Sequence, residues 1–343
     1  MKKKLKEILG KQILFFDGGT GTVLQEWGLK PGEFSENWNI SHPEKIQQLH
    51  YEYYKAGANI IKTNTFGALS IKFPLNLEKI ITSAIQNANN ARNQIQKENQ
   101  ASDKNEYFIA YDISSTGKLL KPLGDLDFED AVNIFKKSFN IALKQNIDCI
   151  LIETMNDGYE TKAAVLAAKE SLQENKIDLP IFVTNVYDSD ARLLSGATPE
   201  SMVAMLEGLG VDAIGINCSL GPEQMLPVVS KLSKVSSLPI IVNPNAGLPR
   251  VQNGKTVFDV EPTDFVQTME QIVELGACVI GGCCGTNPTY IKELTQKLSN
   301  AKIQPITQKN LSVISSGTKF PFSINSFAIN PVGVPSLIAS LNM

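Results

Sequence analysis

Short apolar runs alternate with amphipathic stretches along most of this chain. Eight runs, each a few residues long and rich in Ile, Val, Leu or Phe, have the length and composition of β-strands and end at polar or glycine residues. The stretches between them carry apolar residues at helical spacing. The predicted strands cover residues 14–16, 59–62, 107–111, 149–152, 181–183, 213–216, 240–242 and 278–280. The predicted helices cover residues 41–56, 128–144, 161–172, 199–209, 223–232, 262–275 and 288–298.

This alternation predicts an α/β fold, a (β/α)8 TIM barrel with a short C-terminal extension. The strands are too apolar to show a polar face, which is typical of parallel strands buried on both sides. Eight strand–helix units within roughly 250 to 300 residues are the size of such a barrel. An open doubly wound sheet is the main alternative. The barrel is favoured because most of the runs end in a polar or reactive residue, and the carboxyl ends of barrel strands all face one site.

The alternation stops near residue 301. Residues 304–316 are rich in Ser, Thr, Gln and Asn, which is typical of a linker, and residues 317–343 carry no pattern long enough for a domain. We therefore predict a barrel domain over residues 1–303 and a linker and tail over residues 304–343.

Composition narrows the functional class. The chain has 343 residues, of which 43% are hydrophobic and 20% charged, a usual balance for a globular protein. A net charge of -3 supplies no basic surface for a phosphate backbone, which argues against nucleic acid as a partner. No stretch is long or apolar enough for a membrane span or a secretory signal. We expect a cytoplasmic protein without a membrane partner.

The five cysteines suggest thiol or metal chemistry rather than a disulfide framework, since their number is odd. Cys283 and Cys284 stand between glycines at the end of the last predicted strand, and Cys218 follows the sixth. In a barrel these strand ends are two strands apart, so the three thiols can converge. Three sulfur ligands with an open fourth position are typical of catalytic zinc. The alternative is that all five are small buried hydrophobes. We prefer that interpretation for Cys149 and Cys278, and for the other three the pattern leaves both open.

Such a zinc ion would serve thiol chemistry. A thiol bound to zinc loses its proton, so a substrate thiol in the open position becomes a thiolate nucleophile at neutral pH. Alkylation of that sulfur follows, and we assign no separate general acid or base.

Two further strand ends supply candidate substrate contacts. Asp17, Gly18 and Gly19 follow the first predicted strand, and Glu153 and Thr154 follow the fourth. Carboxylates and backbone groups on the same rim would suit an amino acid, whose ammonium needs acidic or carbonyl acceptors. Alternatively, Asp17 forms a turn and Glu153 is a solvated charge at a strand end.

Taken together, the strand-end motifs resemble the homocysteine S-methyltransferase family, and within it the homocysteine-binding module of cobalamin-dependent methionine synthase. The likeness covers about residues 10 to 300 and rests on residues 17–22 (DGGTGT), 63–67 (TNTFG), 153–154 (ET), 215–222 (GINCSLGP), 244–247 (PNAG), 253–257 (NGKTV) and 281–286 (GGCCGT).

The resemblance implies a barrel in which Cys218, Cys283 and Cys284 bind Zn²⁺, and in which Asp17, Gly18 and Glu153 lie at the amino and carboxylate groups of homocysteine. It also implies that residues 304–343 resemble the connector and first residues of a folate-binding module.

The function implied is zinc-dependent transfer of a methyl group to the homocysteine thiol, giving methionine. The chain shows no cobalamin-binding histidine motif, so a methylcorrinoid donor would be carried by a separate chain or a missing module. S-methylmethionine and betaine are the alternative donors. An alternative of another class is a non-catalytic subunit that binds homocysteine or zinc. The oligomeric state is not predicted.

Overall fold

A ring of eight parallel strands forms the centre of the molecule. The computed structural model describes residues 5–99, 106–252, 255–309, 313–314 and 322–323. The sheet order is β1-β10-β7-β6-β5-β4-β3-β2. All eight predicted strands are confirmed, with the bounds β1 Leu14–Phe15, β2 Ile60–Lys62, β3 Phe108–Ile113, β4 Cys149–Met155, β5 Ile181–Asn185, β6 Ala213–Asn217, β7 Ile240–Asn243 and β10 Ala277–Ile280.

The first and last strands in the sheet order also meet, so the sheet is a barrel. β1 pairs with β10, where Leu14 lies opposite Val279. On its other side Phe16 bridges to Ile60 at the start of β2, and the Asn59 amide donates to the Phe15 carbonyl at 2.7 Å. The predicted (β/α)8 fold is therefore correct, and the open-sheet alternative is excluded.

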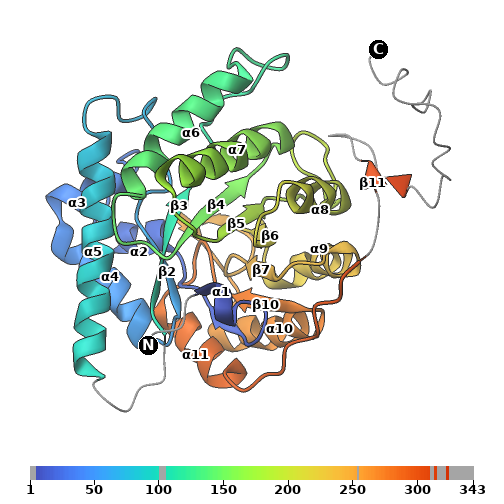
Figure 1. Ribbon diagram of the computed structural model, residues 1–343. Helices are drawn as coiled ribbons and strands as arrows, with labels where there is room; N and C mark the ends of the chain where they lie inside the picture. The colour runs from blue at the N-terminus through green and yellow to red at the C-terminus, as the bar shows by residue number, and fades with distance from the viewer. Residues whose placement is uncertain (1–4, 100–105, 253–254, 310–312, 315–321, 324–343) are drawn as a thin grey trace.

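Helices follow one another around the outside of the ring (Figure 1). The predicted helices are confirmed as α4 Pro43–Lys55, α6 Phe128–Ala142, α7 Gly158–Asn175, α8 Pro199–Gly208, α9 Pro222–Val235, α10 Pro262–Glu274 and α11 Pro288–Leu298. The first of them begins at Pro43, because Ser41 ends the preceding short helix and His42 takes the N-cap position.

Several elements were not predicted from the pattern. The largest is α5 (Leu77–Glu98), which packs against β3 and α4. The shorter ones are α1 Leu5–Ile8, α2 Thr20–Glu26, η1 Ser35–Asn37, α3 Trp38–Ser41 and a hairpin of β8 Arg250–Gln252 with β9 Lys255–Val257.

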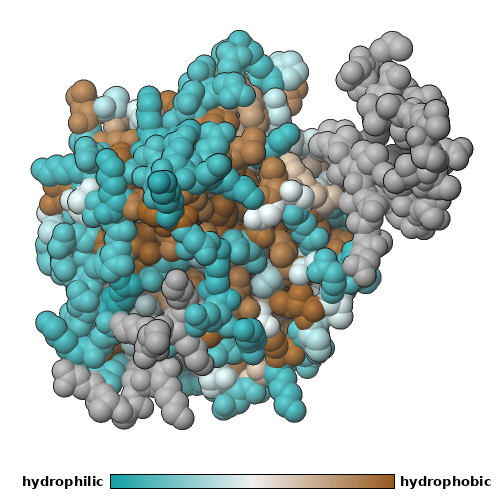
Figure 2. All heavy atoms as spheres, viewed as in Figure 1, coloured by the Kyte–Doolittle hydropathy of each residue, from teal (hydrophilic) through white to brown (hydrophobic). Residues whose placement is uncertain are grey.

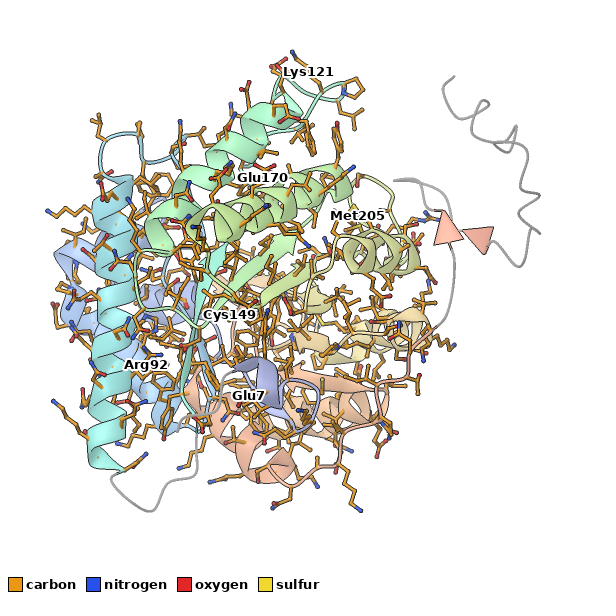
Figure 3. The ribbon with its side chains drawn as sticks, in the orientation of Figure 1. Glu7, Arg92, Lys121, Cys149, Glu170 and Met205 are labelled. Atoms are coloured by element: carbon orange, nitrogen blue, oxygen red, sulfur yellow. The ribbon has the colours of Figure 1, made fainter. Side chains whose placement is uncertain are left out.

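The apolar runs are buried on both faces, as parallel barrel strands require. Every residue of β3, β5, β6 and β7 is buried. Hydrophilic residues cover the outer surfaces of α5, α6 and α7, and hydrophobic residues gather nearer the centre (Figure 2). Cys149 lies on β4 inside the ring of helices with no exposed surface, and Cys278 on β10 is 1% exposed (Figure 3). Both cysteines are therefore core residues, as predicted.

Most of the predicted tail lies outside the described residues. Within 304–343, residues 304–309 form no helix or strand, and β11 (Val313–Ile314) pairs antiparallel with β12 (Phe322–Ser323). The boundary at residue 303 and the likeness to a folate-binding module stay predictions. Within the ranges that the structure describes, no helix has the length and apolar character needed to cross a membrane.

Candidate metal and substrate site

Three thiols meet at the carboxyl end of the barrel. Cys218 follows β6, and Cys283 and Cys284 follow β10. Their sulfur atoms all lie within 4.8 Å of one another, and the Sγ atoms of Cys218 and Cys284 are 4.0 Å apart. Zn–S bonds of about 2.3 Å in a tetrahedron place two sulfurs about 3.8 Å apart. The predicted convergence of the three thiols is confirmed, and their number and spacing could hold a metal ion such as zinc.

The backbone turns sharply to place the Cys218 thiol. Cys218 and Ser219 have φ angles of +59° and +65°, in the left-handed region that non-glycine residues rarely adopt. The turn is held by hydrogen bonds: the Cys218 amide donates to the Asn243 carbonyl at 3.1 Å, and the Leu220 amide donates to the Cys218 carbonyl at 2.7 Å. β6 therefore ends where its next side chain must face the cluster.

Hydrogen bonds to the loop after β7 hold the cysteine pair. The Cys283 amide donates to the Pro244 carbonyl at 2.8 Å, and the Cys284 amide donates to Asn245 Oδ1 at 3.1 Å. Gly281 precedes the pair because a Cβ there would lie 2.8 Å from the Asp17 carbonyl oxygen. The glycine thus lets β10 end directly against the end of β1.

The thiols share protons unequally. Hydrogen bonding with Cys283 and Cys284 lowers the pKa of Cys218 to about 3, against the opposing effect of burial. The same hydrogen bonding raises the pKa of Cys283 to about 12 and that of Cys284 further still. Cys218 therefore gives up its proton more readily than the other two thiols, and a soft cation that displaced the thiol protons would find three thiolate ligands.

The two predicted acidic residues do lie together, but around a lysine. Asp17 and Glu153 are 1% and 4% exposed, so neither is a solvated surface charge. Lys62, the last residue of β2, is 4% exposed, and its Nζ lies 3.4 Å from Asp17 Oδ1 and 4.0 Å from Glu153 Oε2. Asp17 Oδ2 also accepts a hydrogen bond from the Lys62 amide at 2.8 Å.

Burial is the largest influence on the pKa values of the carboxyl groups around Lys62. It raises the pKa of Asp17 and of Glu153 to about 7 each, although Lys62 opposes both shifts. It also raises the pKa of Asp112 well above its usual range. Burial alone would lower the pKa of Lys62, but Glu153 and Asp17 outweigh it and hold that pKa above its usual value.

The remaining predicted contacts are backbone positions near this group. The Gly19 amide donates to Thr286 Oγ1 at 3.1 Å, and its carbonyl accepts from the Tyr53 hydroxyl at 2.9 Å. A Cβ on Gly18 would lie 2.7 Å from Thr286 Oγ1, so the glycines allow the β1 end to pack against the cysteine loop. Thr154 has a φ of +59°, and its amide donates to Asn217 Oδ1 at 2.9 Å.

Sequence reasoning missed three side chains of the site: Lys62, Asp112 and Asn217. Asn217 Nδ2 donates to Glu153 Oε2 at 3.2 Å and lies 4.0 Å from Cys283 Sγ. All three stand at the ends of predicted strands. That position is the signal that also marked Asp17 and Cys218, and it could have identified them.

Comparison with known proteins identifies relatives of this chain. A sequence model described as homocysteine S-methyltransferase matches residues 14–298. The chain belongs to the homocysteine S-methyltransferase family. Two curated relatives are methionine synthases. The one from Mycobacterium leprae (strain TN) is 29% identical over 333 residues, and the one from Mycobacterium tuberculosis (strain ATCC 25618 / H37Rv) is 29% identical over 329 residues. The match covers 93% of this chain but only 27% of either relative.

A solved structure has the same homocysteine S-methyltransferase fold. The metallated form of the homocysteine methyltransferase MmuM from Escherichia coli matches with a TM-score of 0.68 and 24% identity, covering 83% of this chain and 96% of that one. Its oxidised form matches with a TM-score of 0.70 and 22% identity, at the same coverage. These likenesses confirm the barrel independently of the strand pairing.

Proposed function

We propose that this barrel transfers a methyl group to the thiol of homocysteine and forms methionine, with Zn²⁺ bound by Cys218, Cys283 and Cys284. The observation that carries the proposal is the meeting of three thiols from two strand ends in a member of this family. Three sulfur ligands would leave a fourth position on a tetrahedral zinc ion for the substrate. When bound, zinc would supply acidity, because it lowers the pKa of a coordinated thiol.

The side chains below the thiols suit an amino acid. We assign Asp17, Gly18, Gly19, Glu153 and Thr154 to the homocysteine backbone. Among the described residues, Asp17 Oδ1, Asp112 Oδ1 and both amide atoms of Asn243 are buried without a hydrogen-bond partner. Buried polar atoms of this kind normally have partners, so a polar ligand is expected to supply them.

The reaction is a displacement at carbon. The sulfur forms a bond to the methyl carbon, the bond from that carbon to its donor breaks, and its electron pair stays on the donor. The thiol proton goes to solvent. The protein supplies alignment of the two reactants, which is an established source of rate.

We further propose that the methyl group arrives on a corrinoid protein, as a separate chain or another module. Large hydrophobic side chains are exposed in the segments that follow β2, β4, β5 and β7, which include the first turn of α7 and the strand β8, at the same end of the barrel as the thiols. They are Phe66, Tyr159, Leu194, Leu248 and Val251. Leu194 and Val251 are 75% and 81% exposed. Exposed apolar surface marks protein interaction sites, whereas betaine or S-methylmethionine would need none.

We also propose how this barrel relates to a longer protein and where in the cell it acts. The chain spans about a quarter of the length of the curated methionine synthases that it matches. We propose that residues 304–343 link the barrel to a folate-binding module. A cytoplasmic location suits three thiols that must stay reduced.

Substitution of one ligand tests the metal assignment. Cys218→Ser should lower the zinc content after reconstitution from one equivalent per chain to a small fraction and abolish methionine formation. Cys278→Ser is the matched control, since that core cysteine lies outside the cluster, and it should keep its zinc. A Cys218→Ser protein with full zinc and full activity would overturn the assignment.

A donor panel tests the rest of the proposal. The zinc-loaded protein is given homocysteine with a methylcorrinoid protein, S-methylmethionine or betaine, and methionine is quantified. Turnover with the corrinoid protein alone is the expected result, and Leu194→Asp should slow it by weakening docking. Turnover with S-methylmethionine alone would show that it, and not a corrinoid protein, is the methyl donor. Homocysteine binding without turnover by any donor would favour the non-catalytic alternative.

A further inference from the structure

Lys62 is an unusual residue to find at the centre of this site. Lysine is almost never fully buried unless its charge is paired. Here the ammonium lies inside the barrel, with contacts to Asp17 Oδ1 at 3.4 Å, to Glu153 Oε2 at 4.0 Å and to the Gly282 carbonyl at 3.4 Å. Charge-assisted hydrogen bonds are about 2.7–2.9 Å long. All three contacts are longer than that.

The ammonium is therefore paired in charge but poorly hydrogen-bonded. It carries three protons. Its one hydrogen bond in the described part of the chain is the long contact to Gly282. Facing it, Asp17 Oδ1 is buried and makes no hydrogen bond, although it forms the ion pair. A cation with unused donors thus lies beside a carboxylate with an unused acceptor atom.

The position of this pair relates it directly to the thiols. Gly282, which accepts from Lys62, immediately precedes Cys283. Asn217 Nδ2 spans the gap on the other side, since it contacts both Glu153 Oε2 and Cys283 Sγ. A small molecule with its sulfur at the cluster would place its other end next to Lys62.

We propose that Lys62 binds the α-carboxylate of the thiol substrate, while the free oxygen of Asp17 receives its ammonium. The paired charges of an amino acid would then complete both unsatisfied groups at once. The inference rests on the proposed function and deepens it: Lys62 is the residue that determines specificity for the carboxylate of the substrate.

The rival role for Lys62 is that of an internal counter-ion. In that case the ammonium serves only to neutralise Asp17 and Glu153, and it never touches the substrate. The two roles differ in which part of the substrate Lys62 senses, so substrate analogues separate them.

The experiment measures thiol binding to zinc-reconstituted protein by calorimetry, so that it does not depend on a methyl donor. The ligands are homocysteine, 3-aminopropane-1-thiol, which lacks the carboxylate, and 4-sulfanylbutanoate, which lacks the ammonium. The wild-type protein should bind homocysteine at least about tenfold more tightly than the aminothiol, as a charged hydrogen bond predicts. Lys62→Met should reduce that ratio to near one with little loss of affinity for the aminothiol. Lys62→Arg should keep part of it.

Three results would overturn the proposal. The first is a wild-type protein that binds homocysteine and the aminothiol equally well, which needs no variant to fold. The second is a Lys62→Met variant that keeps the wild-type ratio of affinities for homocysteine and the aminothiol. The third is a Lys62→Met variant that keeps this ratio but loses its preference for homocysteine over 4-sulfanylbutanoate. The last would establish the counter-ion role. A wild-type protein that binds zinc but no thiol would instead remove the proposed function itself.

Discussion

At the scale of single residues, Asn217 does most to hold the two halves of the site together. Its Oδ1 accepts from the Thr154 amide at 2.9 Å and from the Thr184 hydroxyl at 2.8 Å. Its Nδ2 donates to Thr154 Oγ1 at 2.7 Å as well as to Glu153. One buried amide therefore connects the ends of β4, β5 and β6.

Removing that amide should destabilise the barrel. Asn217→Ala would leave the Thr154 amide and the Thr184 hydroxyl buried without partners, at about 1–3 kcal/mol for each such group. We expect the free energy of unfolding, measured with urea, to fall by roughly 2–4 kcal/mol. Asn146→Ala, which removes an amide from the exposed surface, should change it by less than about 0.5 kcal/mol. Equal effects in the two variants would contradict the central role of Asn217.

The buried carboxyls predict a pH dependence of stability. The pKa values of Asp17 and Glu153 rise from 3.8 and 4.5 to about 7 on folding, so between these limits the folded state binds more protons than the unfolded state. Their contribution to stability is full below about pH 4 and is lost as pH rises through 7. In metal-free protein, the free energy of unfolding should therefore fall between pH 5 and 7, by up to about 1.4 kcal/mol per pH unit for each group.

Substitution checks the source of this slope. Asp17→Asn keeps the shape of the side chain but cannot ionise, and it should flatten the dependence in urea titrations at fixed ionic strength. Asp188→Asn, on an exposed loop, should leave the slope as it is. An unaltered slope in Asp17→Asn would place the titrating group elsewhere.

The sequence predicted site residues such as the cysteines, whose residue type itself indicates metal or thiol chemistry. It missed residues such as Lys62, whose role depends on side chains from other strands. Adjacent cysteines between glycines at a strand end raised the possibility of a thiol cluster, and the resemblance to a known family favoured it over burial as small hydrophobes. Lys62 was taken only as the polar end of a strand, since no local pattern shows that two carboxylates from β1 and β4 close around it. The charges that face a ligand come from several strand ends, which meet only in the folded barrel.

At the scale of elements, strands were easier to predict than the helix starts and the loops. The barrel strands are nearly all apolar because they are buried on both faces, and that signal is local. The helix α5 was missed because its many Asn residues are weak helix formers, and packing against α4 and β3 decides its conformation. α2 and α3 begin between the predicted strand at residues 14–16 and the predicted helix at residues 41–56, where no element was predicted. They are only 7 and 4 residues long, too short to show a helical pattern.

Two predicted helix starts hold in detail. Thr198 and Asn287 each precede a proline at the first turn, and each side chain caps its helix by accepting from a backbone amide. The Asn287 cap matters more to the site, because α11 begins directly after the cysteine loop.

Loss of that cap should loosen the loop measurably. In Asn287→Ala, the hydrogen bond from the Thr289 amide at 2.9 Å disappears, and we expect a loss of about 1 kcal/mol in the free energy of unfolding. Asn287→Ser keeps an acceptor and should recover most of it. If Ala and Ser behave alike in urea titrations, the side chain does not act as a cap.

At the scale of the whole molecule, hydrogen bonds of the barrel set the positions of the three clustered cysteines. The backbone on both sides of each cysteine is hydrogen-bonded to neighbouring strand ends, and the strands beneath are fully buried. This differs from small zinc domains, which are unfolded without their metal.

Removal of metal should therefore leave the fold intact. After treatment with a chelator, the far-ultraviolet circular dichroism spectrum should stay the same, activity should be lost, and added zinc should restore it. The thermal midpoint should fall by roughly 2–4 °C for each kcal/mol of stabilisation that the ion supplied. Loss of the helical spectrum on chelation would show that the ion organises the barrel.

The pairing of β1 with β10 has a consequence for the order in which the site is made. Asp17 and Cys283 are brought together by the strands that begin and complete the ring, and such contacts between distant parts of a chain are slow to form. During synthesis the thiol cluster stays incomplete until residue 284 has left the ribosome. Because Asp17 reaches the cysteine loop only when β1 pairs with β10, its approach to the thiols in a refolding experiment would time the closure of the barrel.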